Sequence, residues 1–382
     1  MKHHVIYRLL WLSAVAALVI ALGWLDRHRG GPATMLSRCN LLLSRSEAPA
    51  ADILIVGSSR TGAALDPIAM QQMLAHALPS AAPTVERIAL GESPLRASLA
   101  LLENYLVHRG TPQVIALEVM FMTERSVNRL AQRGIAGPPE QYVFRRDINL
   151  MTFEQILRLP SVAMPFSEDE GSVNRWRFRL RGIVLRAGAL AYQFLRQPAD
   201  SWQLAACDQA AFTREPTWPA DFAFSYGDSA VDAAPSKMIE TLEIIMSERA
   251  ADRTLKDWQA GVPKFRSYPY DFEAAYRAGE VEILKSMLNM AARRGVPVVL
   301  LPLPLYGYTP AARDLRTLTD WIPEQTHIFD LYGQVRADLD KFWYDDGHIE
   351  VYPAGALTTA ILAQHLLDTG VLTVDGTERA HD

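Results

Sequence analysis

Two stretches at opposite ends of the chain carry residue types that can do nucleophilic chemistry. The first runs from Asp52 to Thr61, where four apolar residues end abruptly in Gly57-Ser58-Ser59. This pattern predicts a buried strand, a tight turn and a helix start. A serine at the carboxyl end of a central strand lies where open α/β sheets bind ligands, and nearby backbone N–H groups can stabilise an oxyanion. The alternative is ordinary turn chemistry without catalysis.

The second stretch, Asp345-Asp346-Gly347-His348, lies just before the last predicted helix. An aspartate three residues before a histidine on a loop can place its carboxylate against the imidazole, fixing the tautomer and stabilising the imidazolium. A serine within reach of the other ring nitrogen then becomes a competent nucleophile. We take Asp345 as the partner of His348 and Asp346 as the alternative. A surface loop with capping aspartates is the interpretation without catalysis.

Alternating strands and helices should position these two stretches. The predicted strands are residues 52–56, 84–90, 113–122, 296–301 and 327–330. The predicted helices are residues 66–78, 94–108, 272–294, 311–321 and 353–367. Such alternation predicts the α/β class, with a flavodoxin-like parallel sheet of about five strands joined by right-handed crossovers. The serine turn follows the first strand and the histidine loop follows the last, so both should meet at one sheet edge. We expect a hydrogen bond of about 2.6–3.2 Å there.

The α/β pattern is interrupted between residues 123 and 270. We therefore predict one domain, residues 52–382, whose core is 52–122 and 271–369 and whose insertion is 123–270. The insertion should lie over or beside the carboxyl ends of the strands. Within it, residues 175–181 alternate cationic and apolar side chains, which predicts a half-buried strand or extended arm. Its cations form either a solvated face or a surface for acidic head groups or an acidic glycan.

The N-terminus predicts a membrane segment. Basic residues precede an apolar run from Leu9 to Leu25, and charged residues follow it. We predict an uncleaved anchor in residues 1–29, with a cleaved signal peptide as the alternative. The positive flank should remain cytoplasmic, so the bulk of the chain should lie outside the cytoplasmic membrane. Residues 30–51 would then be a connector, at most about 70 Å long if fully extended.

Composition excludes several function classes. The net charge of −5 argues against a nucleic-acid partner recognised by bulk electrostatics. Cys39 and Cys207 fit neither a metal site nor a redox pair, and form either one disulfide or two buried thiols. No His, Cys and carboxylate cluster has metal-ligand spacing, so we expect no required metal and no cofactor. His327, at the start of the fifth strand, is interpreted as structural.

Taken together, the serine block, the glycine after the second strand and the late Asp-x-x-His resemble the SGNH (GDSL-type) hydrolases. This resemblance implies that Ser59 is the nucleophile, His348 the base and Asp345 its orienter. It also implies that the backbone N–H groups of Ser59 and Gly91 form the oxyanion hole. Ser58 stands where the family usually has aspartate, and it is also a competing nucleophile whose side chain should point elsewhere.

The third family motif, Gly-x-Asn-Asp, is not recognisable. The third predicted strand carries Glu118 instead, a carboxylate that would repel an oxyanion. We expect Glu118 to bind Arg60 or a substrate hydroxyl. The family's asparagine donor to the oxyanion has no recognisable counterpart in this motif.

The serine variant, the N-terminal anchor and the late Asp-x-x-His resemble a narrower group, the membrane-anchored, DltD-like members of the superfamily. That resemblance implies a periplasm-facing serine acyltransferase or esterase acting on acyl groups, such as O-acetyl or aminoacyl groups, of a cell-envelope polysaccharide or polymer. It also implies a membrane-bound O-acyltransferase as partner. The alternatives are a free-standing GDSL-type esterase or lipase, and a non-catalytic SGNH-like scaffold of a polymer-modifying complex.

Overall fold

The structure of the 382-residue chain is a computed structural model. It describes residues 11, 13, 17, 21, 40, 43–90, 95–119, 151, 153–158, 180, 182–184, 186, 187, 233–261, 280–303, 306, 307, 319, 320, 322, 326–345 and 347–372. Within this part of the chain, no helix combines the length and apolar character needed to cross a membrane. Most of the predicted anchor, both cysteines and nearly all of residues 175–181 lie outside it.

A five-stranded parallel sheet forms the centre of the fold, in the order β2-β1-β3-β4-β5. Its strands are β1 (Ile53–Ser58), β2 (Val85–Leu90), β3 (Val114–Glu118), β4 (Val298–Leu301) and β5 (Thr326–Ile328). The apolar runs in β1, β3 and β4 are buried along their whole length, as expected for parallel strands covered on both faces. The predicted α/β class is confirmed, and the strand order is consistent with a flavodoxin-like fold. All five strands come from the two segments predicted to form the core.

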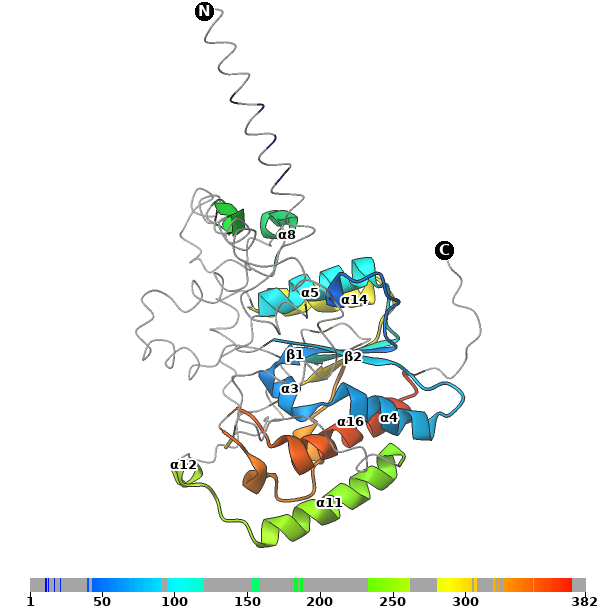
Figure 1. Ribbon diagram of the computed structural model, residues 1–382, viewed down its shortest axis with the longest axis vertical. Coiled ribbons are helices and arrows are strands. Elements are labelled where there is room, and N and C mark those ends of the chain that lie inside the picture. The colour runs from blue at the N-terminus through cyan, green and yellow to red at the C-terminus, as the bar shows by residue number, and fades with distance from the viewer. Residues whose placement is uncertain are drawn as a thin grey trace, which may run out of the picture.

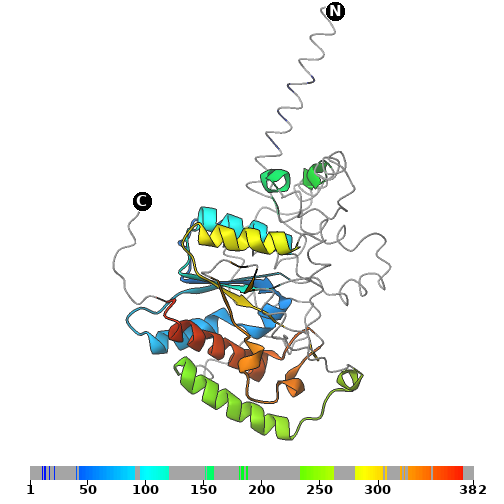
Figure 2. The same ribbon diagram turned by 180° about the vertical axis from the view of Figure 1, so that it is seen from behind.

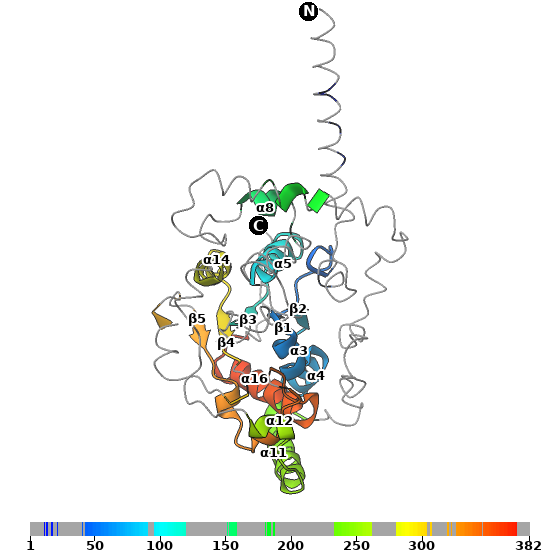
Figure 3. The same cartoon turned by 90° about the vertical axis from the view of Figure 1, so that its left-hand side faces the viewer.

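Helices cover both faces of the sheet (Figures 1 and 3). One face carries α3 (Ser59–Ala64), α4 (Pro67–Ala77) and α16 (Ala356–Asp368), with α11 (Pro235–Ala251) packed outside α16. The other face carries α5 (Leu95–His108) and α14 (Glu280–Ala292), which lie side by side in Figure 2. Shorter elements are α8 (Phe153–Arg158), α12 (Asp257–Ala260), the 3₁₀ turns η6 (Tyr332–Gln334) and η7 (Leu339–Phe342), and the π-type turn η8 (Val351–Gly355). A buried apolar cluster lies between the sheet and each helical layer. The two clusters hold the strands, and therefore their carboxyl ends, in fixed positions.

The order of elements after β1 differs from the prediction. The chain forms α3 immediately after β1, where a turn was predicted, and the helix expected near Asp66 is the next one, α4. Asp66 caps α4 by accepting hydrogen bonds from the N–H groups of Ile68 and Ala69. The first half of the predicted helix at 272–294 and most of that at 311–321 lie outside the described residues.

Three described parts of the predicted insertion contact different regions of the fold. The amide of Gln155 in α8 donates to Ala100 O of α5 at 3.0 Å, on one helical layer. The α11 helix packs on α16, on the other layer. Figure 3 shows α8 and α11 at the outer sides of the two helical layers, whereas the insertion was expected over or beside the carboxyl ends of the strands. Trp258 in α12 does lie beside the carboxyl edge. The centre of its ring lies 5.0 Å from the centre of the Tyr306 ring, and Tyr306 follows shortly after β4.

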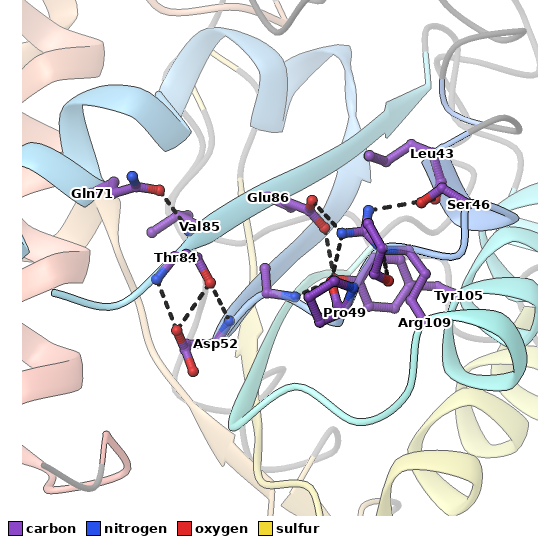
Figure 4. Close-up of polar contacts among 12 residues, drawn as sticks. Leu43, Ser46, Pro49, Asp52, Gln71, Thr84, Val85, Glu86, Tyr105 and Arg109 are labelled. Atoms are coloured by element: carbon purple, nitrogen blue, oxygen red, sulfur yellow. Dashed lines mark hydrogen bonds and ion pairs between the residues drawn. The ribbon is translucent and has the colours of Figure 1, made fainter. Parts of the chain in front are cut away.

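Residues 43–51, predicted as the end of a connector, are bound to the domain (Figure 4). The Arg109 guanidinium donates to Ala48 O at 3.1 Å and Pro49 O at 2.7 Å, and pairs with Glu86 at 2.7 Å. The Tyr105 hydroxyl accepts from Ala51 N and donates to Glu86. These contacts lie at the amino edge of the sheet, opposite Ser59. Any free connector is therefore shorter than predicted.

Candidate active site

Ser59 is the first residue after β1 and the first residue of α3. The preceding Ser58 is the N-cap of that helix, and its Oγ accepts a hydrogen bond from Arg60 N at 3.1 Å. Serine is favoured at this position because its side chain satisfies an N–H group that has no acceptor inside the helix. The local sequence thus fixes Ser59 at the point where the chain leaves the carboxyl edge of the sheet.

His348 lies on a short hairpin that precedes η8 and α16. An antiparallel bridge joins Trp343 to Ile349, and Tyr344 N donates to His348 O at 2.9 Å. At the tip, Asp345 Oδ1 accepts from the N–H groups of Gly347 and His348, at 2.7 and 2.8 Å. The Asp-x-Gly-His sequence therefore folds as a side-chain-stabilised turn, which fixes the aspartate relative to the histidine backbone.

The hydrogen bonds of the His348 ring connect the serine turn after β1 with the histidine hairpin. Nε2 lies 2.8 Å from Ser59 Oγ, although the two residues are 289 positions apart in the sequence. Nδ1 lies 2.8 Å from Oδ1 and 3.0 Å from Oδ2 of Asp345. The predicted meeting of Ser59 and His348 is confirmed, and the distance falls within the predicted range. This geometry allows the imidazole to take a proton from Ser59 while its other nitrogen donates to the carboxylate.

The charge of Asp345 suits this arrangement. Burial raises the pKa of its carboxyl, but the hydrogen bond and charge of His348, with the N–H groups of Gly347 and His348, lower that pKa more. The net pKa therefore lies below that of an ordinary aspartate, and the group is ionised at neutral pH. The His348 side chain keeps 22% of its surface exposed, so a substrate can approach it.

Glu118 forms a buried polar cluster beneath the serine. The register of β1 and β3 pairs Val56 with Leu117, which places Glu118 beside Gly57. The fully buried Glu118 carboxylate pairs with Arg60 Nη2 at 2.7 Å, confirming the expected contact with Arg60. Its Oε2 also accepts from Ser58 N at 2.7 Å and from the Thr61 hydroxyl. Glu118 thus binds the backbone and side chains around Ser59.

The same cluster orients Ser58 away from the histidine. Ser58 Oγ donates to Glu118 Oε1 at 2.9 Å, as expected for a side chain that points elsewhere. Gly57 makes the close approach possible, because a Cβ there would lie within 2.7 Å of Glu118 Oε2 and would overlap the Thr61 hydroxyl. Of the two serines, Ser59 is the one whose hydroxyl lies within hydrogen-bond distance of the imidazole.

Two threonines of α16 join the serine helix to the helix that follows the histidine hairpin. The hydroxyls of Thr358 and Thr359 both donate to Ala64 O, the last residue of α3. Thr359 Oγ1 also accepts from Asp66 N at 3.0 Å, and both threonines are fully buried. The helix that begins at Ser59 is therefore bonded, inside the fold, to the helix that follows the His348 hairpin.

The remaining predicted residues are Gly91, Asp346 and His327. Gly91 and Asp346 lie outside the described residues. His327 is exposed on β5, where it lies near enough to His365 of α16 to influence that residue's charge. Where the structure is described, no group of three His, Cys, Asp or Glu side chains could hold a metal ion.

Sequence reasoning missed Thr61, which completes the Glu118 cluster, and the two threonines of α16. Thr61 follows Ser59 by two residues, so its position near the turn was a usable signal. Compared with protein-family models, with curated proteins and with solved structures, the chain finds no match.

Proposed function

We propose that the protein is a serine acyltransferase or esterase of the SGNH type, with Ser59 as nucleophile, His348 as general base and Asp345 as orienter. The observation that carries this proposal is the continuous hydrogen-bond chain from Ser59 Oγ through the imidazole to the Asp345 carboxylate. Such a chain is the arrangement by which a weakly acidic hydroxyl becomes a nucleophile.

In the first half-reaction, Ser59 Oγ attacks the acyl carbonyl while His348 Nε2 takes the hydroxyl proton. The ionised Asp345 stabilises the resulting imidazolium. The carbonyl electron pair becomes an oxyanion, which the backbone N–H of Ser59 and, by the family resemblance, that of Gly91 stabilise. Collapse of the tetrahedral intermediate breaks the bond to the leaving alcohol, which receives the proton from His348. The acyl group is then an ester of Ser59.

In the second half-reaction, an acceptor hydroxyl attacks this ester while His348 takes its proton. The bond between the acyl carbon and Ser59 Oγ then breaks, and His348 returns the proton to Ser59. Water as acceptor gives hydrolysis, whereas a sugar or polymer hydroxyl gives transfer. Both outcomes use the same residues and differ only in which acceptor reaches the acyl-enzyme. Glu118 supports the backbone around the nucleophile, because it is bound to Ser58, Arg60 and Thr61.

The proposed setting is the periplasmic face of a bacterial inner membrane, where the enzyme acts on O-acetyl or aminoacyl groups of an envelope polymer beside a membrane-bound O-acyltransferase. This part rests on the apolar N-terminal run and on the resemblance to DltD-like proteins. The docked residues 43–51 support a short tether. Residues 30–39 could span about 35 Å at most, so the site would face material close to the membrane.

A fluorophosphonate probe, which modifies activated serines covalently, tests the proposal. We expect the purified protein to be labelled and Ser59→Ala to be unlabelled. Ser286→Ala is the matched control, because Ser286 is also partly buried and hydrogen-bonded, to Glu282 O on α14, but lies on the other helical layer. A folded wild-type protein that takes no label would favour the non-catalytic scaffold instead.

A further inference from the structure

The hairpin that carries His348 is too small to fix its own position. Its own backbone contacts include the Trp343–Ile349 bridge, the bond from Tyr344 to His348, and a bond from Glu350 N to Phe342 O at 2.6 Å. An isolated two-stranded hairpin is at best marginally stable in water. The position of the imidazole therefore depends on what holds the base of the hairpin.

Residues 253–259, which lead from α11 into α12, hold that base. Arg253 and Lys256 pair with opposite oxygens of the Glu350 carboxylate, at 2.6 and 3.1 Å. Lys256 Nζ also donates to Trp343 O, on the other strand of the hairpin, at 2.7 Å. One lysine thus joins both strands at the level of the Trp343–Ile349 bridge, close to His348.

Neighbouring contacts extend this grip toward the start of the hairpin. The buried Gln259 accepts from Lys256 N at 2.7 Å and donates to Asp340 O at 2.6 Å. The Arg253 guanidinium lies 4.6 Å from the centre of the buried Phe342 ring. Gln259 thus binds the backbone of Lys256 on one side and the chain that leads into the hairpin on the other.

The energetics favour a role in positioning over one in global stability. The side chains of Arg253 and Lys256 are 32% and 38% exposed, and ion pairs this exposed add little to global stability. Yet the donors converge on one hairpin, across 87 to 97 residues of sequence. Errors of about 1 Å in the placement of a catalytic group can cost about 100-fold in rate.

We propose that residues 253–259 are a positioning clamp that holds the His348 hairpin in register with Ser59. This inference rests on the proposed function, because it concerns the base of that reaction. Lys256 is a positioning residue, since it acts through the hairpin and not on the substrate. A segment of the predicted insertion would thereby be part of the catalytic architecture.

The test is the kinetics of fluorophosphonate labelling of Lys256→Met in the full chain. We expect the maximal labelling rate to fall about 10- to 100-fold, because the imidazole is no longer held against Ser59. The probe concentration that gives half the maximal rate should change less than about twofold, since the clamp does not contact the probe. Lys256→Arg, which retains the charge and the donors, should recover most of the rate.

Lys285→Met is the matched control. Lys285 is equally exposed, at 36%, and forms an ion pair of the same 3.1 Å length with Glu282, but on α14. We expect this variant to be labelled at the wild-type rate. If Lys256→Met fails to fold, Glu350→Gln is the variant that tests the clamp. It should also lower the maximal labelling rate.

The clamp and the proposed function fail in different ways. A wild-type protein without label at Ser59 overturns the proposed function. A labelled wild type with equally fast labelling of Lys256→Met, or of Glu350→Gln where that variant decides, overturns the clamp alone. A slow Lys256→Met that Lys256→Arg does not restore also contradicts the clamp, because the loss then follows the lysine chain and not its charge and donors.

Discussion

Replacing Glu118 by glutamine tests whether the buried cluster beneath Ser59 supports the nucleophile. The substitution keeps the shape of the side chain but removes the charge that balances Arg60, whose side chain is only 11% exposed. Breaking a buried ion pair from one side costs about 3–5 kcal/mol. Ser58 N and the Thr61 hydroxyl both donate to Oε2 of the carboxylate. An amide N–H₂ in the place of that oxygen could not accept these hydrogen bonds.

We therefore expect Glu118→Gln to lower the free energy of unfolding by about 3–5 kcal/mol in urea titrations followed by circular dichroism. Labelling of the remaining folded protein should also slow, because the backbone around Ser59 loses its buried acceptor. Replacing Arg60 by methionine in the same chain should recover part of the stability, since no unpaired charge then remains buried.

Glu86→Gln is the matched control for this experiment. Glu86 forms an equally short ion pair, 2.7 Å long, with the nearly buried Arg109 at the opposite edge of the sheet. We expect this variant to lose stability and to keep the wild-type labelling rate per folded molecule. The reasoning is refuted if Glu118→Gln is as stable as the wild type, or if both variants slow labelling equally.

Three further predictions concern the turn, the aspartate and the N-terminus. Gly57→Ala should destabilise the fold and slow labelling, because a Cβ there overlaps the neighbouring threonine hydroxyl; urea midpoints and labelling rates check this. Asp345→Asn should destabilise the protein most near neutral pH. The lowered pKa of Asp345 gives stability that is present above the unfolded pKa, about 3.9, and lost as pH falls through the folded value. Midpoints measured from pH 3 to 7 should therefore converge at the acid end, and a constant difference would contradict this. Removing residues 1–29 should leave the thermal midpoint unchanged. Removing residues 1–51 should lower it, because the Arg109 guanidinium loses two of its acceptors, Ala48 O and Pro49 O. Equal midpoints would disprove the docking of residues 43–51.

The sheet and the two ends of the site could be predicted because their signals are local. An uninterrupted apolar run before Gly57 identifies a buried strand, and an aspartate three residues before a histidine identifies a possible pair. The meeting of Ser59 and His348 then follows from the parallel sheet, which brings the carboxyl ends of its strands to one edge. The contact between Glu118 and Arg60 was expected from charge alone.

Other features carried weaker signals. The α3 helix has six residues, too few for a periodic pattern, so the sequence at Ser58 and Ser59 resembled a turn. The α11 helix had a usable signal that was overlooked: Pro235 at its first turn, and buried Met238, Leu242 and Met246 spaced by four. Surrounding residues without clear periodicity concealed it.

Other contacts between distant segments could not be predicted from the sequence. The grip of Lys256 on Glu350 depends on how α11 packs against α16, which no local pattern encodes. The bond from Ser58 N to Glu118 likewise depends on the register of β1 and β3. One residue of slip would move that side chain to the other face of the sheet.

The central claim is that Ser59 forms a covalent acyl intermediate with the help of His348. The most direct measurement is peptide mapping by mass spectrometry after brief exposure to p-nitrophenyl acetate and acid quenching. We predict an acetyl group on Ser59 and none on Ser58, formed about 100- to 10,000-fold more slowly in His348→Ala. Acetylation of Ser58 in place of Ser59, or formation at the wild-type rate without His348, would contradict the account.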